Sequence, residues 1–149
     1  MVKPPGGREK PWHQDAAFFK YPSTVPIVGV WVALSKVSRD NGCMCVLLPS
    51  NHPRTDATVP TGVFPHFQRR DWQICDMDIQ KLEPSAAAIE MEPGDILFFS
   101  SLLPHGTRIN TSDSHRWAVQ LHYVDASAVE ASDTERLQTF GPGVDNVTC

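Results

Sequence analysis

The sequence predicts an all-β fold, a β-sandwich or jelly roll with few short helices. Short apolar runs rich in β-branched and aromatic residues recur along the chain, and turn-forming residues separate them. The 13 prolines and 9 glycines are spread out, which disfavours long helices. Many short strands joined by turns are typical of sandwiches and jelly rolls, a pattern that several unrelated families share.

The strongest strand signal lies in the first third of the chain. A long strand is predicted over Val25–Val37, where valine and isoleucine accompany Trp31. Arg39–Gly42 predicts a hairpin turn, because its Asn-Gly pair accepts positive φ angles. Cys43–Leu48 is then the partner strand of that hairpin, and Pro49–Pro60 is a loop.

The middle of the chain predicts one helix and two strands. A short helix is expected over Trp72–Leu82, and a strand over Ala87–Met91. Pro93–Gly94 is a turn signal, and Asp95–Ser101 (DILFFSS) is predicted to be a buried strand because it is strongly apolar.

Two strands and a polar tail complete the predicted order. A short strand or strand end covers Pro104–Thr107, and Ile109–Ser114 is a polar turn. Arg116–Val124 is the last clear strand. Residues 125–149 form a polar tail, with one helical turn expected near Ala128–Leu137.

Length and charge restrict the possible functions. A chain of 149 residues suits one domain, 1–149, with one core. The net charge of −4, without a clustered basic face, argues against binding nucleic acid. No apolar run approaches the ~18 residues of a membrane span, and the N-terminus lacks the apolar core of a signal peptide. We therefore expect a cytoplasmic protein with no membrane partner.

Cysteine usage is sparse. A small secreted disulfide scaffold would carry more than these 4 cysteines. Cys43 and Cys45 share one face of a predicted strand, so a C-x-C zinc half-site is one interpretation. No second pair stands at a matching spacing, which favours buried, reduced thiols.

The segment Trp12-His13-Gln14-Asp15 is the first candidate metal-binding motif. An imidazole and a carboxylate two residues apart project from the same side of an extended chain, so both reach one ion. The motif alone is weak, since a surface turn with a hydrogen-bonded histidine has the same sequence.

His105 is a second candidate. It follows a very apolar strand, and Gly106 allows close approach of the backbone. The alternative is a core histidine hydrogen-bonded to a carbonyl group.

Arg116 stands eleven residues after His105, a spacing that fits a strand end, a turn and a returning strand. A guanidinium in so apolar a strand is costly unless it meets an anion, and a carboxylate matches its fork. The alternative is a strand-end arginine that pairs with Asp113 or with solvent.

Together these residues suggest one chemistry. Two histidines and one carboxylate on one face of a metal leave positions open for a cosubstrate and oxygen, which suits non-haem iron(II). 2-Oxoglutarate chelates such a metal through its keto-acid end, and Arg116 is the candidate partner of its far carboxylate.

A larger set of motifs occurs in a fixed order along the chain. These are WHQD (12–15), VWVAL (30–34), NGC (41–43), LPSNH (48–52), PGD (93–95), LLPHG (102–106) and the later Arg116. From about Lys3 to Tyr123, the chain strongly resembles the phytanoyl-CoA dioxygenase family of iron(II)/2-oxoglutarate oxygenases.

The resemblance implies a double-stranded β-helix, the jelly roll also found in cupins. It implies that His13, Asp15 and His105 bind iron(II) and that Arg116 binds 2-oxoglutarate. It also implies that the cosubstrate pocket is lined by a further set of residues: Gln14, Trp31 and Thr107.

Two of these pocket assignments carry alternatives. Strand alternation points Gln14 away from the metal unless the chain bends locally, and Trp31 is equally suited to the core. The remaining histidines are interpreted as structural, rim, surface or packing residues: His52, His66, His115 and His122.

The implied reaction is hydroxylation of a small organic substrate by O2, with 2-oxoglutarate decarboxylated to succinate and ascorbate as a further candidate cofactor. Related halogenases carry a small residue at the carboxylate position, so Asp15 favours hydroxylation over halogenation. Two alternatives stay open: a cupin-like metal enzyme that does not use 2-oxoglutarate, and a non-catalytic jelly-roll binding domain.

The chain also departs from the family pattern. Family members have a substantial N-terminal region before the WHQD motif, whereas twelve residues precede His13 here. We therefore expect a chain truncated at the N-terminus, with an exposed sheet edge that invites association or misfolding.

Overall fold

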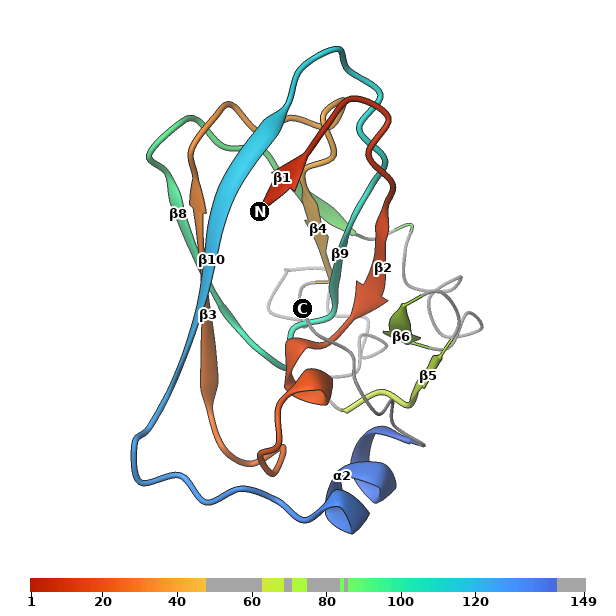
Figure 1. Cartoon of the computed structure of the whole chain (residues 1–149), viewed down its shortest axis with the longest axis vertical. Coiled ribbons are helices and arrows are strands. Elements are labelled where there is room, and N and C mark those ends of the chain that lie inside the picture. Colours follow the sequence, from red (N-terminus) through yellow and green to blue (C-terminus); the bar gives the residue numbers. More distant parts are fainter. Residues whose placement is uncertain (48–62, 69–70, 75–83, 85, 142–149) are drawn as a thin grey trace.

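The computed structural model describes residues 1–47, 63–68, 71–74, 84 and 86–141. The described strands form two four-stranded antiparallel sheets and a two-stranded ribbon (Figure 1). One sheet has the strand order β1-β10-β3-β8 and the other β2-β9-β4-β7. The all-β class predicted from the sequence is confirmed.

The elements have the following bounds. The first sheet consists of β1 (Val2–Lys3), β10 (Arg116–Val124), β3 (Ile27–Ala33) and β8 (Ile96–Ser100). The second consists of β2 (Lys10–His13), β9 (His105–Thr107), β4 (Met44–Val46) and β7 (Ala87–Ile89). The ribbon pairs β5 (His66–Gln68) with β6 (Trp72–Ile74). The described helices are the 3-10 helix η1 (Asp15–Phe18) and α2 (Asp133–Phe140).

The predicted hairpin between the strands around Arg39–Gly42 is wrong. The turn itself is present, with Gly42 at φ 80° and the Asn41 side chain accepting the Ser38 N–H at 2.8 Å. However, β3 pairs with β10 and β8, whereas β4 pairs with β9 and β7. The turn therefore carries the chain from one sheet to the other, which local turn chemistry cannot distinguish from a hairpin.

The helix predicted over Trp72–Leu82 is also wrong at its start, because Trp72–Ile74 is strand β6. Apolar runs this short do not separate helix from strand by periodicity. The rest of that prediction, and the predicted loop Pro49–Pro60, lie outside the described residues.

The C-terminal helix α2, with 8 residues, has more than the one turn predicted near Ala128–Leu137, and it extends beyond that range. A capping box starts it, because the Ser132 side chain accepts the Glu135 N–H and the Glu135 side chain accepts the Ser132 N–H. Its last residue, Phe140, is 1% exposed and packs against Ala16 and Ala17 of η1. Part of the expected polar tail is therefore core, and it buttresses the segment that follows Asp15.

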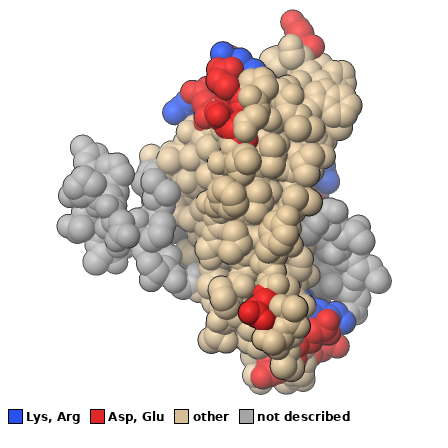
Figure 2. All heavy atoms as spheres, turned by 90° about the vertical axis from the view of Figure 1, so that its left-hand side faces the viewer, with Lys and Arg blue, Asp and Glu red and all other residues tan. Residues whose placement is uncertain are grey.

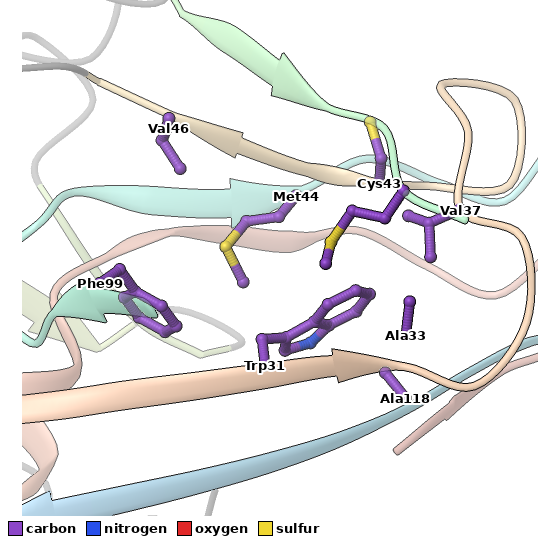
Figure 3. Packing of buried hydrophobic residues seen from close by; sticks show 9 residues of the cluster. Trp31, Ala33, Val37, Cys43, Met44, Val46, Phe99 and Ala118 are labelled. Atoms are coloured by element: carbon purple, nitrogen blue, oxygen red, sulfur yellow. The ribbon is translucent and has the colours of Figure 1, made fainter. Parts of the chain in front are cut away.

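The core lies between the two four-stranded sheets (Figure 3). Trp31 is its largest buried side chain. The other members come from both sheets and their connections: Ala33, Val37, Cys43, Met44, Val46, Met91, Phe99 and Ala118. Cys43 and Cys45 are buried free thiols, as the sequence favoured.

The strand β8 is not buried on both faces, which corrects the prediction for Asp95–Ser101. Phe99 is buried, whereas its neighbour Phe98 is 66% exposed. The same alternation continues across the sheet and exposes a set of apolar side chains on its outer face: Val28, Ile96, Phe98, Trp117, Val119, Leu121 and Tyr123. Figure 2 looks onto this side of the molecule, and the central surface carries no charged residue.

Within the described part of the chain, no helix combines the length and the apolar character needed to span a membrane.

Candidate metal centre

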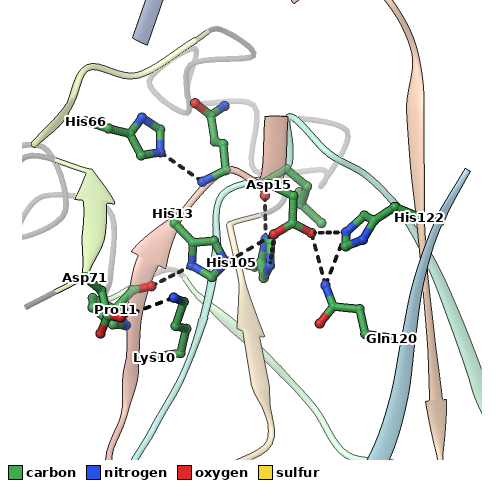
Figure 4. A network of polar contacts seen from close by, with 11 residues as sticks. Lys10, Pro11, His13, Asp15, His66, Asp71, His105, Gln120 and His122 are labelled. Carbon is green, nitrogen blue, oxygen red and sulfur yellow. Dashed lines mark hydrogen bonds and ion pairs between the residues drawn. The ribbon is translucent and has the colours of Figure 1, made fainter. Parts of the chain in front are cut away.

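Three separate segments bring His13, Asp15 and His105 together (Figure 4). His13 ends β2 and His105 begins β9, and the two residues are direct partners in the antiparallel register. A register shift between Lys10 and His13 bends β2 beside this pair. Asp15 opens η1, so the chain turns immediately after the strand and returns the carboxylate to the two imidazoles.

The ligand atoms of this cluster all lie within 4.8 Å of one another. Asp15 Oδ1 is 3.3 Å from His13 Nε2 and 3.5 Å from His105 Nε2. Metal–nitrogen bonds are about 2.0–2.1 Å long, so neighbouring ligands on one ion stand about 3 Å apart. The spacing therefore fits a shared metal ion.

Backbone carbonyl groups orient both imidazoles. His13 Nδ1 is 2.7 Å from the Pro11 carbonyl oxygen, and His105 Nδ1 is 2.9 Å from that of Leu103. When each Nδ1–H donates to its carbonyl, the Nε2 lone pair faces the cluster, which is the tautomer that a metal ligand needs.

Burial and hydrogen bonds shift the pKa values of two candidate ligands, His105 and Asp15. Burial, followed by the charge of His13, lowers the pKa of His105 to about 4, so its imidazole is neutral at pH 7. Burial alone would raise the pKa of Asp15, but hydrogen bonds with His122 and His13 hold that pKa below its ordinary value. The cluster thus offers two imidazoles and one carboxylate, which is the donor set that suits non-haem iron(II).

His122 is a site residue that the sequence interpretation missed. Its Nε2 lies 2.7 Å from Asp15 Oδ2, and Gln120 Nε2 donates to the same oxygen at 3.2 Å (Figure 4). The sequence did contain a signal for this role, because alternate residues of a strand point to the same face. The face of β10 that carries Arg116 also carries Ala118, Gln120 and His122. The surface-or-packing interpretation of His122 is therefore wrong.

Arg116 lies at the edge of the same cavity. This cavity has a volume of about 360 Å³, and its lining includes His13, Asp15, His105 and Arg116. Arg116 is 2% exposed, and its Nε and Nη1 atoms have no hydrogen-bond partner among the described residues. Burial lowers the pKa of this guanidinium below its ordinary value. The expected alternative, pairing with Asp113 or solvent, does not occupy these two atoms.

Trp31 and Thr107 also line the cavity, and their contact with a cosubstrate stays a prediction. The Arg116 guanidinium carbon lies 5.1 Å from the centroid of the Trp31 ring, so this tryptophan serves both the core and the cavity. The Thr107 hydroxyl accepts hydrogen bonds from Lys3 Nζ at 2.8 Å and from the Lys10 N–H at 3.3 Å.

Gln14 is buried but does not line the cavity. Its side-chain amide donates to the Leu102 carbonyl oxygen at 2.6 Å, and its side-chain oxygen accepts the Phe64 N–H at 2.9 Å. The Gln14 N–H donates to His66 Nε2 at 3.1 Å, which makes His66 a buried packing residue. These contacts hold the segment between the ligands His13 and Asp15, and a cosubstrate contact of Gln14 stays a prediction.

Among the described residues, this is the one group of three or more metal-ligating side chains close enough to share an ion. A family comparison adds to this geometry. Residues 1–118 match the model of the phytanoyl-CoA dioxygenase (PhyH) family. The chain belongs to this family. The family resemblance predicted from the sequence is confirmed.

Individual relatives agree with the assignment. The chain is 31% identical over 150 residues to peroxisomal phytanoyl-CoA dioxygenase of Bos taurus, and 33% identical over 155 residues to that of Homo sapiens. These alignments cover 91% and 95% of this chain but 42% and 44% of the relatives. The chain therefore spans less than half the length of the curated relatives it matches.

A solved structure shares the fold. EvdO2 from Micromonospora carbonacea var. aurantiaca, in its complex with 2-oxoglutarate, superposes with a TM-score of 0.67 at 25% identity. The match covers 89% of this chain and 51% of that chain. The jelly-roll architecture expected from the sequence is confirmed by this similarity.

Proposed function

We propose that this chain is the catalytic core of an iron(II)/2-oxoglutarate-dependent dioxygenase that hydroxylates a small organic substrate. The observation that carries the proposal is the buried Arg116 guanidinium, which has two unpartnered nitrogens and belongs to a residue that lines the same cavity as the His13–Asp15–His105 cluster. A metal cluster with a buried cation beside it suits a ligand with a keto acid at one end and a carboxylate at the other.

Different residues would bind the iron and the 2-oxoglutarate. His13, Asp15 and His105 would hold the iron through two imidazole nitrogens and one carboxylate oxygen. Arg116 would bind the far carboxylate of 2-oxoglutarate, with Trp31 packed beside the guanidinium. Iron(II), when bound, supplies the redox chemistry that couples decarboxylation of 2-oxoglutarate to succinate with hydroxylation of the substrate by O2.

The protein itself positions the candidate ligands and keeps them away from bulk water. All three candidate ligands are buried, and backbone carbonyls hold both rings before any metal arrives. The cavity volume of about 360 Å³ falls in the range of small-molecule sites, about 300–1,000 Å³. A cavity of this size favours a small substrate. The proposal also includes ascorbate as a reductant and a cytoplasmic location.

Anaerobic titration with iron(II) and then 2-oxoglutarate tests the proposal. The expected result is a visible charge-transfer band that appears only when both are present. Arg116→Ala should retain iron binding and lose the band at 2-oxoglutarate concentrations that saturate the wild type, because the far carboxylate loses the Arg116 guanidinium.

Two outcomes would favour the alternatives. If Arg116→Ala left 2-oxoglutarate binding unchanged, the proposal would lose its main support, and the cupin-like alternative would stay open. If the folded wild type bound iron but gave no band, a non-catalytic binding domain would be favoured.

A further inference from the structure

Lys3 stands directly opposite Arg116 in the first sheet. The pair is in register in the antiparallel ladder between β1 and β10. Directly opposed residues have Cβ atoms about 4.5–5.5 Å apart and point to the same face. Their chain neighbours Val2 and Trp117 are exposed, whereas Lys3 and Arg116 are 7% and 2% exposed, so both cations point inward.

Two glycines leave the space that the Lys3 side chain fills. A Cβ at Gly42 would lie 2.9 Å from Lys3 Cδ and 3.3 Å from Lys3 Nζ. A Cβ at Gly7 would lie 2.8 Å from Lys3 Cγ. The absence of a Cβ at these two positions therefore leaves room for the buried Lys3 side chain.

The ammonium retains a donor for a ligand. Lys3 Nζ donates to Thr107 Oγ1 at 2.8 Å and to the Arg108 carbonyl oxygen at 2.5 Å. An ammonium has three N–H donors, so one is left. Lys3, Thr107 and Arg116 all line the cavity that contains the metal cluster.

Two buried like charges face each other here without an ion-paired carboxylate, and the charge of Glu9 offsets only part of the effect of Arg116 on Lys3. Burial, followed by the charge of Arg116, lowers the pKa of Lys3 to about 8. In the described part of the chain, no carboxylate forms an ion pair with Lys3 or contacts Arg116 Nε and Nη1. Directly opposed like charges destabilise a sheet, so the arrangement is suited to an anion that binds between them.

We infer that Lys3 is a second cation of the cosubstrate site and binds the far carboxylate of 2-oxoglutarate together with Arg116. This inference rests on the proposed function. It assigns to β1 a binding role and gives Thr107 the task of holding the Lys3 ammonium as well as lining the cavity.

The test compares two ligands on protein loaded with zinc(II) in place of iron, by calorimetry. 2-Oxoglutarate has the far carboxylate, and 2-oxopentanoate has the same keto-acid end without it. Lys3→Met should weaken 2-oxoglutarate binding about tenfold or more, as expected for a charged hydrogen bond, and leave 2-oxopentanoate binding within about twofold. Lys3→Arg should restore part of the preference for 2-oxoglutarate.

The matched control is Lys10→Met. Lys10 also lines the cavity, but its ammonium pairs with Asp71 at 3.3 Å, so the preference between the two ligands should not change. Thermal unfolding and zinc affinity of each variant report on folding and on the metal cluster.

Each result is decisive. If Lys3→Met weakened the binding of both ligands equally, Lys3 would only support the fold. If it weakened the binding of neither ligand, Lys3 would not contact 2-oxoglutarate. Either result overturns the inference. If the wild type binds 2-oxoglutarate and the Lys3→Met variant prefers 2-oxoglutarate over 2-oxopentanoate as strongly as the wild type does, the inference on Lys3 fails and the proposed function stands. A wild type that binds zinc but not 2-oxoglutarate removes both.

Discussion

At the scale of single residues, the site depends on how the two oxygens of Asp15 are divided. Oδ1 faces the Nε2 atoms of His13 and His105, and Oδ2 receives hydrogen bonds from His122 and Gln120. A carboxylate held at one oxygen presents the other in a fixed direction. Groups that orient metal ligands in this way commonly change metal affinity when they are removed.

The first prediction concerns His122. His122→Phe removes the 2.7 Å contact with Asp15 Oδ2 and keeps a ring of similar size. We expect iron(II) or manganese(II) affinity to fall about 10–100-fold, because Asp15 loses its fixed orientation. Equilibrium metal titration measures this directly.

His115→Phe is the control for that experiment. His115 is exposed and stacks on Trp117 outside the cavity lining, so its loss should leave metal affinity unchanged. If His122→Phe bound metal as tightly as the wild type did, His122 would have no orienting role.

At the scale of elements, the turn between β3 and β4 does more than reverse the chain. Gly42 combines a φ of 80° with close approach to the Arg108 carbonyl oxygen and to Lys3. Gly94, in the turn before β8, has a φ of 96° but no neighbour within 4 Å of an added Cβ. Both glycines therefore have a positive φ, but only Gly42 also has neighbours that leave no room for a Cβ.

The second prediction uses this contrast. Gly94→Ala should lower the free energy of unfolding by about 1–2 kcal/mol, the cost of positive φ for a residue with a Cβ. Gly42→Ala should cost about 1–3 kcal/mol more, because its Cβ would lie 2.5 Å from the Arg108 carbonyl oxygen. Urea denaturation measures both, and equal costs would show that the tight contact relaxes freely.

At the scale of the whole molecule, the two sheets have different surroundings. The second sheet is flanked by the β5–β6 ribbon and carries two of the ligands, His13 and His105. The first sheet exposes a row of large apolar side chains over its outer face, without charges in the centre (Figure 2). Apolar surfaces of this kind promote association.

The third prediction concerns this face. The double variant Phe98→Lys/Tyr123→Lys changes two side chains that are 66% and 59% exposed, so stability should change by about 0.5 kcal/mol per site or less. In sedimentation velocity, we expect the double variant to associate less with rising concentration than the wild type does. Val129→Lys, at a 78% exposed apolar residue outside the sheets, should have no such effect. Equal association of wild type and double variant would contradict the prediction.

The strand positions were largely predictable, whereas several of their partners were not. β3, β8 and β10 lie where β-branched and aromatic runs predicted them, because strand propensity is local. Pairing is not local, and so the Asn41-Gly42 turn suggested a hairpin between strands that belong to different sheets. Burial of β8 was overestimated for a related reason: composition does not show which face of a sheet is covered.

The sequence by itself determined the family, the order of the motifs and the identities of the candidate ligands, because ligand chemistry is carried by residue type and a short spacing such as that of His13 and Asp15. The tertiary structure alone decided which distant residues meet these ligands. It placed His122 against Asp15 and Lys3 opposite Arg116, across separations of more than one hundred residues. Strand register sets such contacts, and register is a property of the assembled sheet.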